Sequence, residues 1–121
     1  MQAINLREKL AKFDDVYHPR VVAALNGQLV KVVKVEGAFP WHSHADEDEL
    51  FWVLDGEMDL EFRDHVVHLG PGELCVVPRG VEHRPNAKTR ASVVLFEPAS
   101  VRSTGEVDHE HTVEVDDLEW V

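Results

Sequence analysis

The chain has 121 residues, the size of one ordinary domain, and can bury a core without help from disulfides. Its single cysteine excludes an intrachain disulfide, and 23 acidic against 12 basic side chains give a net charge of −11. Because that charge repels a phosphate backbone, nucleic acid is not an expected partner. The first residues offer neither a signal-peptide core nor a membrane span, so we expect a soluble, cytoplasmic protein with no membrane partner.

The chain begins with a predicted helix. Asn5 followed by Glu8 is typical of a helix cap, and Leu6, Leu10 and Phe13 share one face at helical spacing. We expect one short amphipathic helix here, covering an end of the barrel that the later strands form.

From Val21 onward, short β-branched runs alternate with turn residues, a layout typical of antiparallel strands in a sandwich or barrel. Asn26-Gly27 accepts positive φ at both central positions of a type I′ turn and predicts a tight hairpin. Asp55-Gly56 predicts a second hairpin of the same kind. A further turn is expected at Asp64-His65, strand-bracketing turns at Gly70-Pro71-Gly72 and Pro78-Arg79-Gly80, and a last strand at residues 91–98. About eight strands result.

The side-chain alternation distinguishes two of these strands. In residues 57–62, Met58, Leu60 and Phe62 share one face and three carboxylates share the other. The face with the carboxylates is expected to be exposed to solvent. In residues 49–54 both faces are apolar, which requires a cover outside the barrel. A second subunit, in a homodimer, is favoured over the N-terminal segment as that cover.

One domain is expected over residues 1–121. It comprises an N-terminal helix and lead-in (1–20), a barrel core (21–100) and an acidic C-terminal extension (101–121). After Arg102 there are seven carboxylates and no Lys or Arg, which predicts a solvated edge or a partly mobile tail.

The residues that carry chemistry are three histidines and one glutamate. His42 and His44, two residues apart on an extended segment, point to the same side, and Glu49 opens the next strand. His83 follows a turn that resets the strand direction. Three imidazoles and a carboxylate suit one divalent transition metal, Mn, Fe, Co, Ni, Cu or Zn, better than Ca or Mg. Four protein ligands leave two positions open on an octahedral ion, as in a reactive site.

At this point the sequence resembles the cupin superfamily, through two motifs. The first, G(X)5HXH(X)3,4E(X)6G, is matched with one residue fewer after its first glycine by Gly37, His42, His44, Glu49 and Gly56. The second, G(X)5PXG(X)2H(X)3N, is matched with a final gap one residue short by Gly72, Pro78, Gly80, His83 and Asn86. Both departures lie outside the spacings between the ligands.

The resemblance implies an all-β cupin fold, the double-stranded β-helix or jelly-roll barrel. It also implies that His42, His44, Glu49 and His83 are the metal ligands. The chain is similar to small single-domain cupins of the cupin 2 conserved barrel type, which are often labelled mannose-6-phosphate isomerase-like. That label carries little weight for the reaction, because fold does not determine function.

Other histidines are weaker candidates. His109 and His111 form a second HXH, expected on an acidic terminal strand without a third ligand beside them. His65 and His68 lie at and beside a turn and are expected to face solvent. His18 has no partner in the sequence pattern.

Several further residues flank the predicted site. We expect Cys75 to act as a small hydrophobic residue rather than as a nucleophile. We expect the side chains of Arg79 and Arg84 to be solvated. The alternative is that they contact an anionic substrate. The residues expected either to wall an apolar pocket around the ion or simply to fill the barrel are Phe39, Trp41, Phe51 and Met58.

Three functions are compatible with these residues. The first is a metalloenzyme acting on a small organic molecule, with the ion as Lewis acid or oxygen-activating centre. The second is a binding or sensing module that holds a small ligand without turnover, and the third is an isomerase of a sugar or sugar phosphate. No residue stands out as a general base, so the catalytic residues are unassigned.

Overall fold

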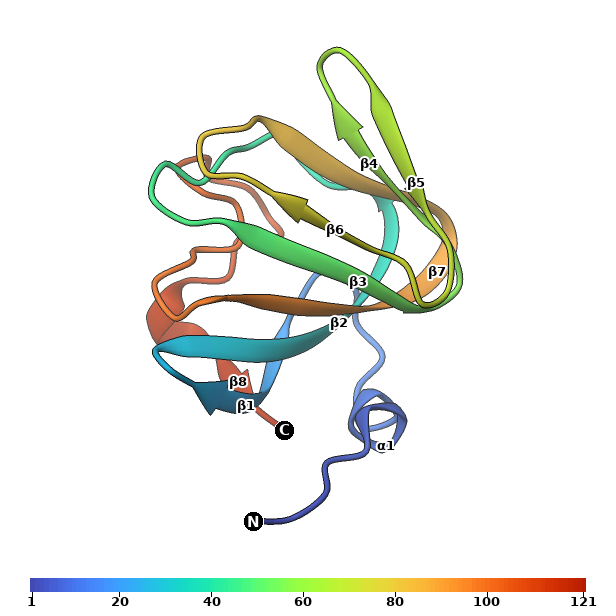
Figure 1. Ribbon diagram of the computed structural model, residues 1–121, viewed down its shortest axis with the longest axis vertical. Coiled ribbons are helices and arrows are strands. Elements are labelled where there is room, and N and C mark those ends of the chain that lie inside the picture. The colour runs from blue at the N-terminus through green and yellow to red at the C-terminus, as the bar shows by residue number, and fades with distance from the viewer.

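The computed structural model describes residues 1–121 as one short helix and eight strands around a common interior (Figure 1). The elements are α1 (Leu6–Leu10), β1 (Arg20–Leu25), β2 (Gln28–Ala38), β3 (Glu49–Asp55), β4 (Met58–Phe62), β5 (Val66–Leu69), β6 (Leu74–Val77), β7 (His83–Pro98), the 3-10 helix η1 (Val115–Asp117) and β8 (Glu119–Trp120). The strands form one sheet in the order β5-β4-β7-β2-β1-β8, with β3 pairing β6 and β7. The sheet is not closed, and the predicted all-β jelly-roll class is confirmed.

Strand β7 organises this sheet. It runs for 16 residues and begins at His83, earlier than the predicted strand at residues 91–98. Its first half pairs with β4, its second half pairs with β3, and β2 follows its other edge along most of its length. One long strand is therefore the common partner of β2, β3 and β4.

The predicted hairpin at Asp55-Gly56 is wrong. β3 and β4 do not pair with each other but lie in succession along β7, so the chain turns a corner between them. Gly56 has φ +81°, and a Cβ on it would lie 3.0 Å from the Ala91 Cα. The glycine serves a close approach to β7, which the same dipeptide in a hairpin would not need.

The other predicted turns are confirmed. Asn26 and Gly27 have φ +52° and +77°, and Leu25 pairs with Gln28 across the tight turn. At Asp64-His65 the chain reverses between β4 and β5, which pair antiparallel. The two turns rich in glycine and proline bracket β6.

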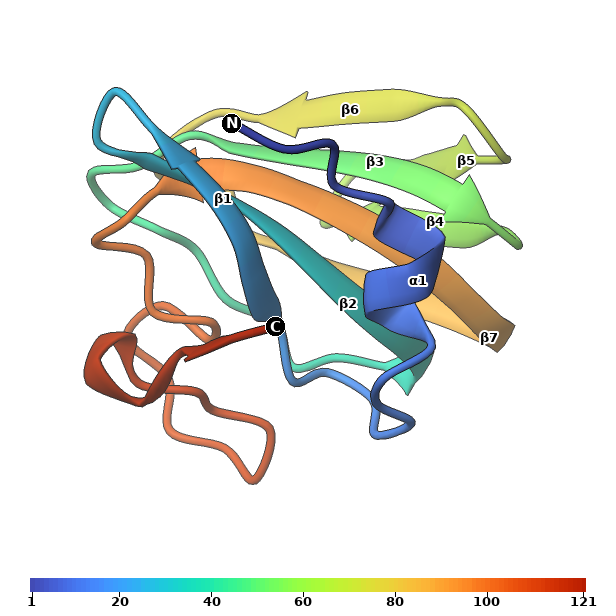
Figure 2. The ribbon, with the colours of Figure 1, turned by 90° about the horizontal axis from the view of Figure 1, so that it is seen from below.

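The helix forms where it was predicted but packs elsewhere. The Asn5 side chain accepts a hydrogen bond from the Glu8 N–H at 3.0 Å, as a cap does. Leu10 is buried against Val22, Val32 and Val94, on the outer face of the sheet. Figure 2 shows α1 lying across β2 and not over a barrel end, so that part of the prediction is wrong.

The outer face of β3 is only partly covered. Leu54 packs beside the cluster that α1 covers, but Trp52 is 39% exposed. Leu74 and Val76 of the neighbouring strand β6 are also exposed on this sheet. The N-terminal segment thus covers one end of this face, and the homodimer stays a prediction.

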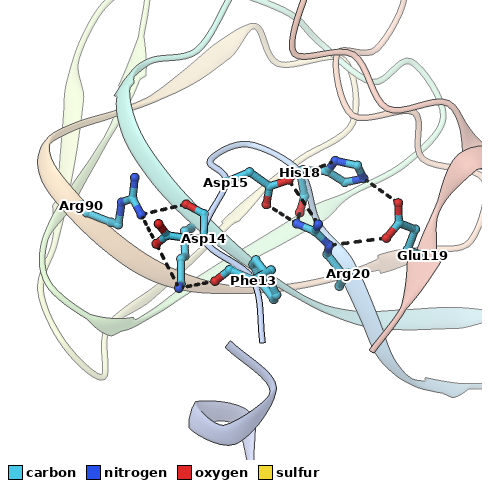
Figure 3. A network of polar contacts seen from close by, with 8 residues as sticks. Phe13, Asp14, Asp15, His18, Arg20, Arg90 and Glu119 are labelled. Carbon is cyan, nitrogen blue, oxygen red and sulfur yellow. Dashed lines mark hydrogen bonds and ion pairs between the residues drawn. The ribbon is translucent and has the colours of Figure 1, made fainter. Parts of the chain in front are cut away.

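A polar network fastens the lead-in segment to four strands, β1, β2, β7 and β8 (Figure 3). Arg90 of β7 donates to both the carbonyl and the carboxylate of Asp14, at 2.8 and 2.7 Å. Arg20 of β1 pairs with Asp15, and His18 lies between Asp15 and Glu119 of β8, at 3.5 and 3.8 Å. The sequence pattern assigned His18 no partner, because these carboxylates reach it only through the fold.

The C-terminal extension differs from the predicted solvated tail. Val101, Thr104 and Val113 are buried, with exposed carboxylates between them. At Gly105, with φ +60°, an added Cβ would lie 2.1 Å from the carbonyl oxygen of Ser43. The extension therefore packs against the segment between the first two predicted metal ligands.

Candidate metal centre

The predicted ligands come from three separate segments of the chain. His42 and His44 lie between β2 and β3, Glu49 is the first residue of β3, and His83 is the first residue of β7. The main chains of His42 and His83 exchange two hydrogen bonds, at 3.1 and 2.9 Å, in an isolated bridge. This bridge fixes the loop that carries His42 and His44 against the long strand.

All four side chains point to one buried place. We call His42, His44, Glu49 and His83 the buried tetrad; none is more than 4% exposed. Each offers a donor atom, and these atoms lie within 4.8 Å of one another. Oε1 of Glu49 is 3.5 Å from Nε2 of His44 and 3.4 Å from Nε2 of His83. The convergence expected from the sequence is present.

Main-chain carbonyls orient two of the imidazoles. Nδ1 of His42 lies 2.8 Å from the Pro40 carbonyl oxygen, and Nδ1 of His83 lies 2.9 Å from that of Val81. When Nδ1 donates in these bonds, Nε2 keeps its lone pair for a metal ion. Side-chain identity does not encode these acceptors, which is why the sequence did not reveal them.

The tetrad fits a metal ion. Nε2 of His44, Nε2 of His83 and Oε1 of Glu49 are buried without a hydrogen-bond partner. Buried polar atoms are rarely left unpaired, since each such atom costs about 1–3 kcal/mol. An ion about 2.0–2.2 Å from each donor would hold the donors roughly 3–3.5 Å apart and would satisfy all three.

The charge state of the tetrad also suits a cation. Burial, and then the neighbouring His83, lower the pKa of His42 to about 4, so its imidazole is neutral at pH 7. Burial by itself raises the pKa of Glu49, but the neighbouring side chains of Glu97, His44 and His83 outweigh it and hold that pKa well below its ordinary value. Neutral imidazole and ionised carboxylate are the forms that bind metals.

The sequence analysis missed two charged residues beside the tetrad. Lys31 of β2 and Glu97 of β7 form an ion pair at 2.8 Å, and each side chain is 2% exposed. With Glu49 and His42 they line a cavity of about 40 Å³. Strand alternation was the available signal, because Lys31 shares a face with the buried Val33 and Glu97 shares one with Leu95.

The residues expected to wall a pocket divide into three groups. Phe39 and Phe51 line the cavity. Met58 is buried in the interior core but does not reach the cavity. Trp41 stacks outside against the guanidinium of Arg63, 3.9 Å from its ring centre.

Neither arginine near the metal loop faces the cavity. Arg79 donates to Asp48, and Arg84 donates to Glu61 at 2.9 Å, both on the outside of the fold. The cationic side chain that does line the cavity is Lys31.

The second HXH lies in a loop before η1, not on the terminal strand that was predicted. Its third ligand was expected to be missing, but the carboxylate of Glu110 lies within 4.8 Å of the imidazoles of His109 and His111. We call these three residues the exposed cluster, since His109 and Glu110 are exposed and His111 is half-buried.

The remaining candidates behave as expected. His65 and His68 face solvent. Cys75 packs against the interior core, and burial raises the pKa of its thiol, which makes it a poor nucleophile. No helix has the length and apolar character needed to cross a bilayer.

Comparisons with known proteins agree with this architecture. A cupin-2 domain containing protein of Shewanella frigidimarina is 45% identical and superposes with a TM-score of 0.78, over 79% of this chain and 94% of that one. A Neisseria meningitidis protein is 32% identical with a TM-score of 0.74, over 80% and 99% of the two chains. The uncharacterized protein YdbB of Bacillus subtilis is 32% identical over 73% of each chain.

The family match covers the same part of the molecule. Residues 29–98 match the family described as "Cupin domain", from the start of β2 to the end of β7. This span includes every residue of the buried tetrad. The chain therefore belongs to the cupin domain family and is a small cupin with a buried histidine and glutamate cluster that could hold a metal ion.

Proposed function

We propose that this protein binds one divalent transition metal ion on the buried tetrad and acts as a metalloenzyme on a small organic molecule. The observation that carries the proposal is the set of buried, unpartnered donor atoms of His44, Glu49 and His83. A purely structural cluster would pair these atoms with each other or with the main chain, as it pairs Nδ1 of His83.

The residues around the tetrad set the conditions for chemistry. A bound ion would supply Lewis acidity or an oxygen-activating centre. His42 and His83, held by main-chain carbonyls, fix the direction of their Nε2 atoms. Phe39 and Phe51 line the cavity and keep much of its wall apolar, which strengthens electrostatic interactions inside it.

Size favours a small substrate. The cavity of about 40 Å³ has room for roughly three waters, at about 10–15 Å³ each. Val101 and Val113 of the C-terminal extension form part of its wall. A molecule of a few heavy atoms fits this space, whereas a sugar phosphate requires the extension to move.

The test begins with metal content. Protein purified without chelator is expected to hold one equivalent of a transition metal by elemental analysis. Removal with a chelator and reloading with Co²⁺ should restore one equivalent, with a visible absorption band from histidine and carboxylate ligation. Less than one equivalent after reloading would contradict the proposal.

Turnover is tested separately. Iron-loaded protein that consumes oxygen with a small organic substrate supports oxygenase chemistry. Fully loaded protein that binds such molecules, seen as a rise in Tm, but converts none of them supports the non-catalytic binding role instead.

A further inference from the structure

The ion pair of Lys31 and Glu97, which we call the inner pair, lies outside the group of donor atoms that could hold the metal ion. Its members lie on neighbouring strands, β2 and β7, and both side chains point into the barrel. The interior around them is lined by valine, leucine and phenylalanine side chains. The pair therefore places two ionisable groups in an otherwise largely apolar wall.

Stability does not account for such a pair. Removing two charges from water costs several kcal/mol for each ion, and their mutual attraction often fails to exceed that penalty. Apolar residues of similar volume at such positions are often neutral or stabilising. A buried pair that lines a cavity beside a functional cluster is instead a candidate for ligand recognition.

One atom of the pair is left free. Lys31 donates to Oε1 of Glu97, while Oε2 of Glu97 is buried with no hydrogen-bond partner. The Lys31 ammonium has three donors and gives one of them to Glu97. The pair thus offers a ligand an acceptor and donors at the same place, which matches a hydroxyl next to a carboxylate.

The net charge of the cavity points to an anion. Lys31 is balanced by Glu97 when Glu97 is ionised, and Glu49 would balance half the charge of a bound divalent ion. The sum is one positive charge when Glu97 is ionised and two when it is protonated. Because a buried excess of charge is costly, an anionic ligand is favoured in either state.

We infer that the inner pair binds the polar end of a small hydroxycarboxylate whose oxygens also reach the metal site. In this arrangement Lys31 donates to the carboxylate and Oε2 of Glu97 accepts from the hydroxyl. The inference rests on the proposed function, since it places the ligand between the inner pair and the buried tetrad.

Glycolate is the probe, because it combines the two groups in a few heavy atoms. Propanoate lacks the hydroxyl, and ethylene glycol lacks the charge. For protein loaded with Co²⁺, glycolate is expected to raise Tm in a concentration-dependent manner, propanoate to do so less, and ethylene glycol not at all. No effect of glycolate on fully loaded protein would overturn the inference.

The deciding variant is the double replacement Lys31→Met with Glu97→Leu, which removes both charges together and leaves neither partner alone. Its Tm without ligand is expected to equal or exceed that of the wild type. Its Co²⁺ content should stay at one equivalent, while its Kd for glycolate rises about 10-fold or more.

The single variant Glu97→Gln is the matched test of the acceptor. It keeps the shape of the side chain, so preference for glycolate over propanoate should fall while binding of propanoate changes little. Equal glycolate affinity in the wild type and the double variant, each with one equivalent of metal, overturns the inference alone. Wild-type protein that holds no metal overturns the proposed function and the inference together.

Discussion

The molecule contains two groups of histidine and glutamate with the HXH pattern, and they differ in their surroundings. The buried tetrad lies inside the barrel, and three of its donor atoms have no partner. The exposed cluster lies in a loop, where Nδ1 of His109 already accepts from the His111 N–H at 3.1 Å. Residue type and spacing alone do not make a metal centre; burial without hydrogen-bond partners distinguishes the first group from the second.

The largest expected effect separates the two groups directly. His83→Ala removes a buried ligand and should reduce the Co²⁺ content from one equivalent to near zero, since loss of a ligand lowers affinity by more than the roughly 10–100-fold of an outer-shell change. The double variant of His109 and His111 to Ala should keep the full equivalent. Elemental analysis measures both, with circular dichroism to confirm folding. Equal metal loss in the two variants would remove the distinction.

Acid sensitivity sharpens the same comparison. In metal-free protein, burial lowers the pKa of His42 to about 4 from an ordinary 6.5. Between these values the unfolded state binds a proton that the folded state does not, so the free energy of unfolding falls as pH drops through this window. His42 alone should account for about 3 kcal/mol by pH 4. Urea unfolding at pH 7 and pH 4, with His42→Gln as control, measures this loss; an equal loss in the control would contradict it.

A third test measures how closely the C-terminal extension packs against Ser43, the residue between His42 and His44 of the buried tetrad. Gly105→Ala places a Cβ against the carbonyl oxygen of Ser43 and puts a side chain on a residue with left-handed backbone conformation. The free energy of unfolding should fall by about 2 kcal/mol or more. Gly27→Ala, at φ +77° with open space around it, should cost only about 1 kcal/mol. Thermal and urea unfolding compare them. Equal losses in the free energy of unfolding for the two variants would contradict a tight contact between Gly105 and Ser43.

The smallest effect concerns an exposed histidine with two carboxylates. Hydrogen bonds from His68 to Asp59 and Glu57 raise the pKa of this imidazole above 6.5. The pairing stabilises the fold below that value and loses its effect as pH rises through the folded pKa. NMR titration of Asp59→Asn should show a lower pKa for His68. An unchanged pKa would assign the shift to other neighbours.

The sequence determined the parts of this protein that depend on neighbouring residues. The Asn26-Gly27 hairpin, the Asn5 cap and the inward face of β4 follow from backbone preferences and strand alternation, which act over a few residues. The set of candidate ligands was also readable, because three of its members lie within eight residues of one another and the fourth follows a recognisable turn.

Only the tertiary structure decided the features that depend on distant strands. Asp55-Gly56 carries a hairpin signature, yet the pairing of β3 and β4 with β7 makes it a corner. The inner pair forms because the register of β2 and β7 brings Lys31 and Glu97 together across 66 positions in sequence. The physical reason is that local propensities fix backbone conformation, whereas burial and charge pairing depend on which strands meet.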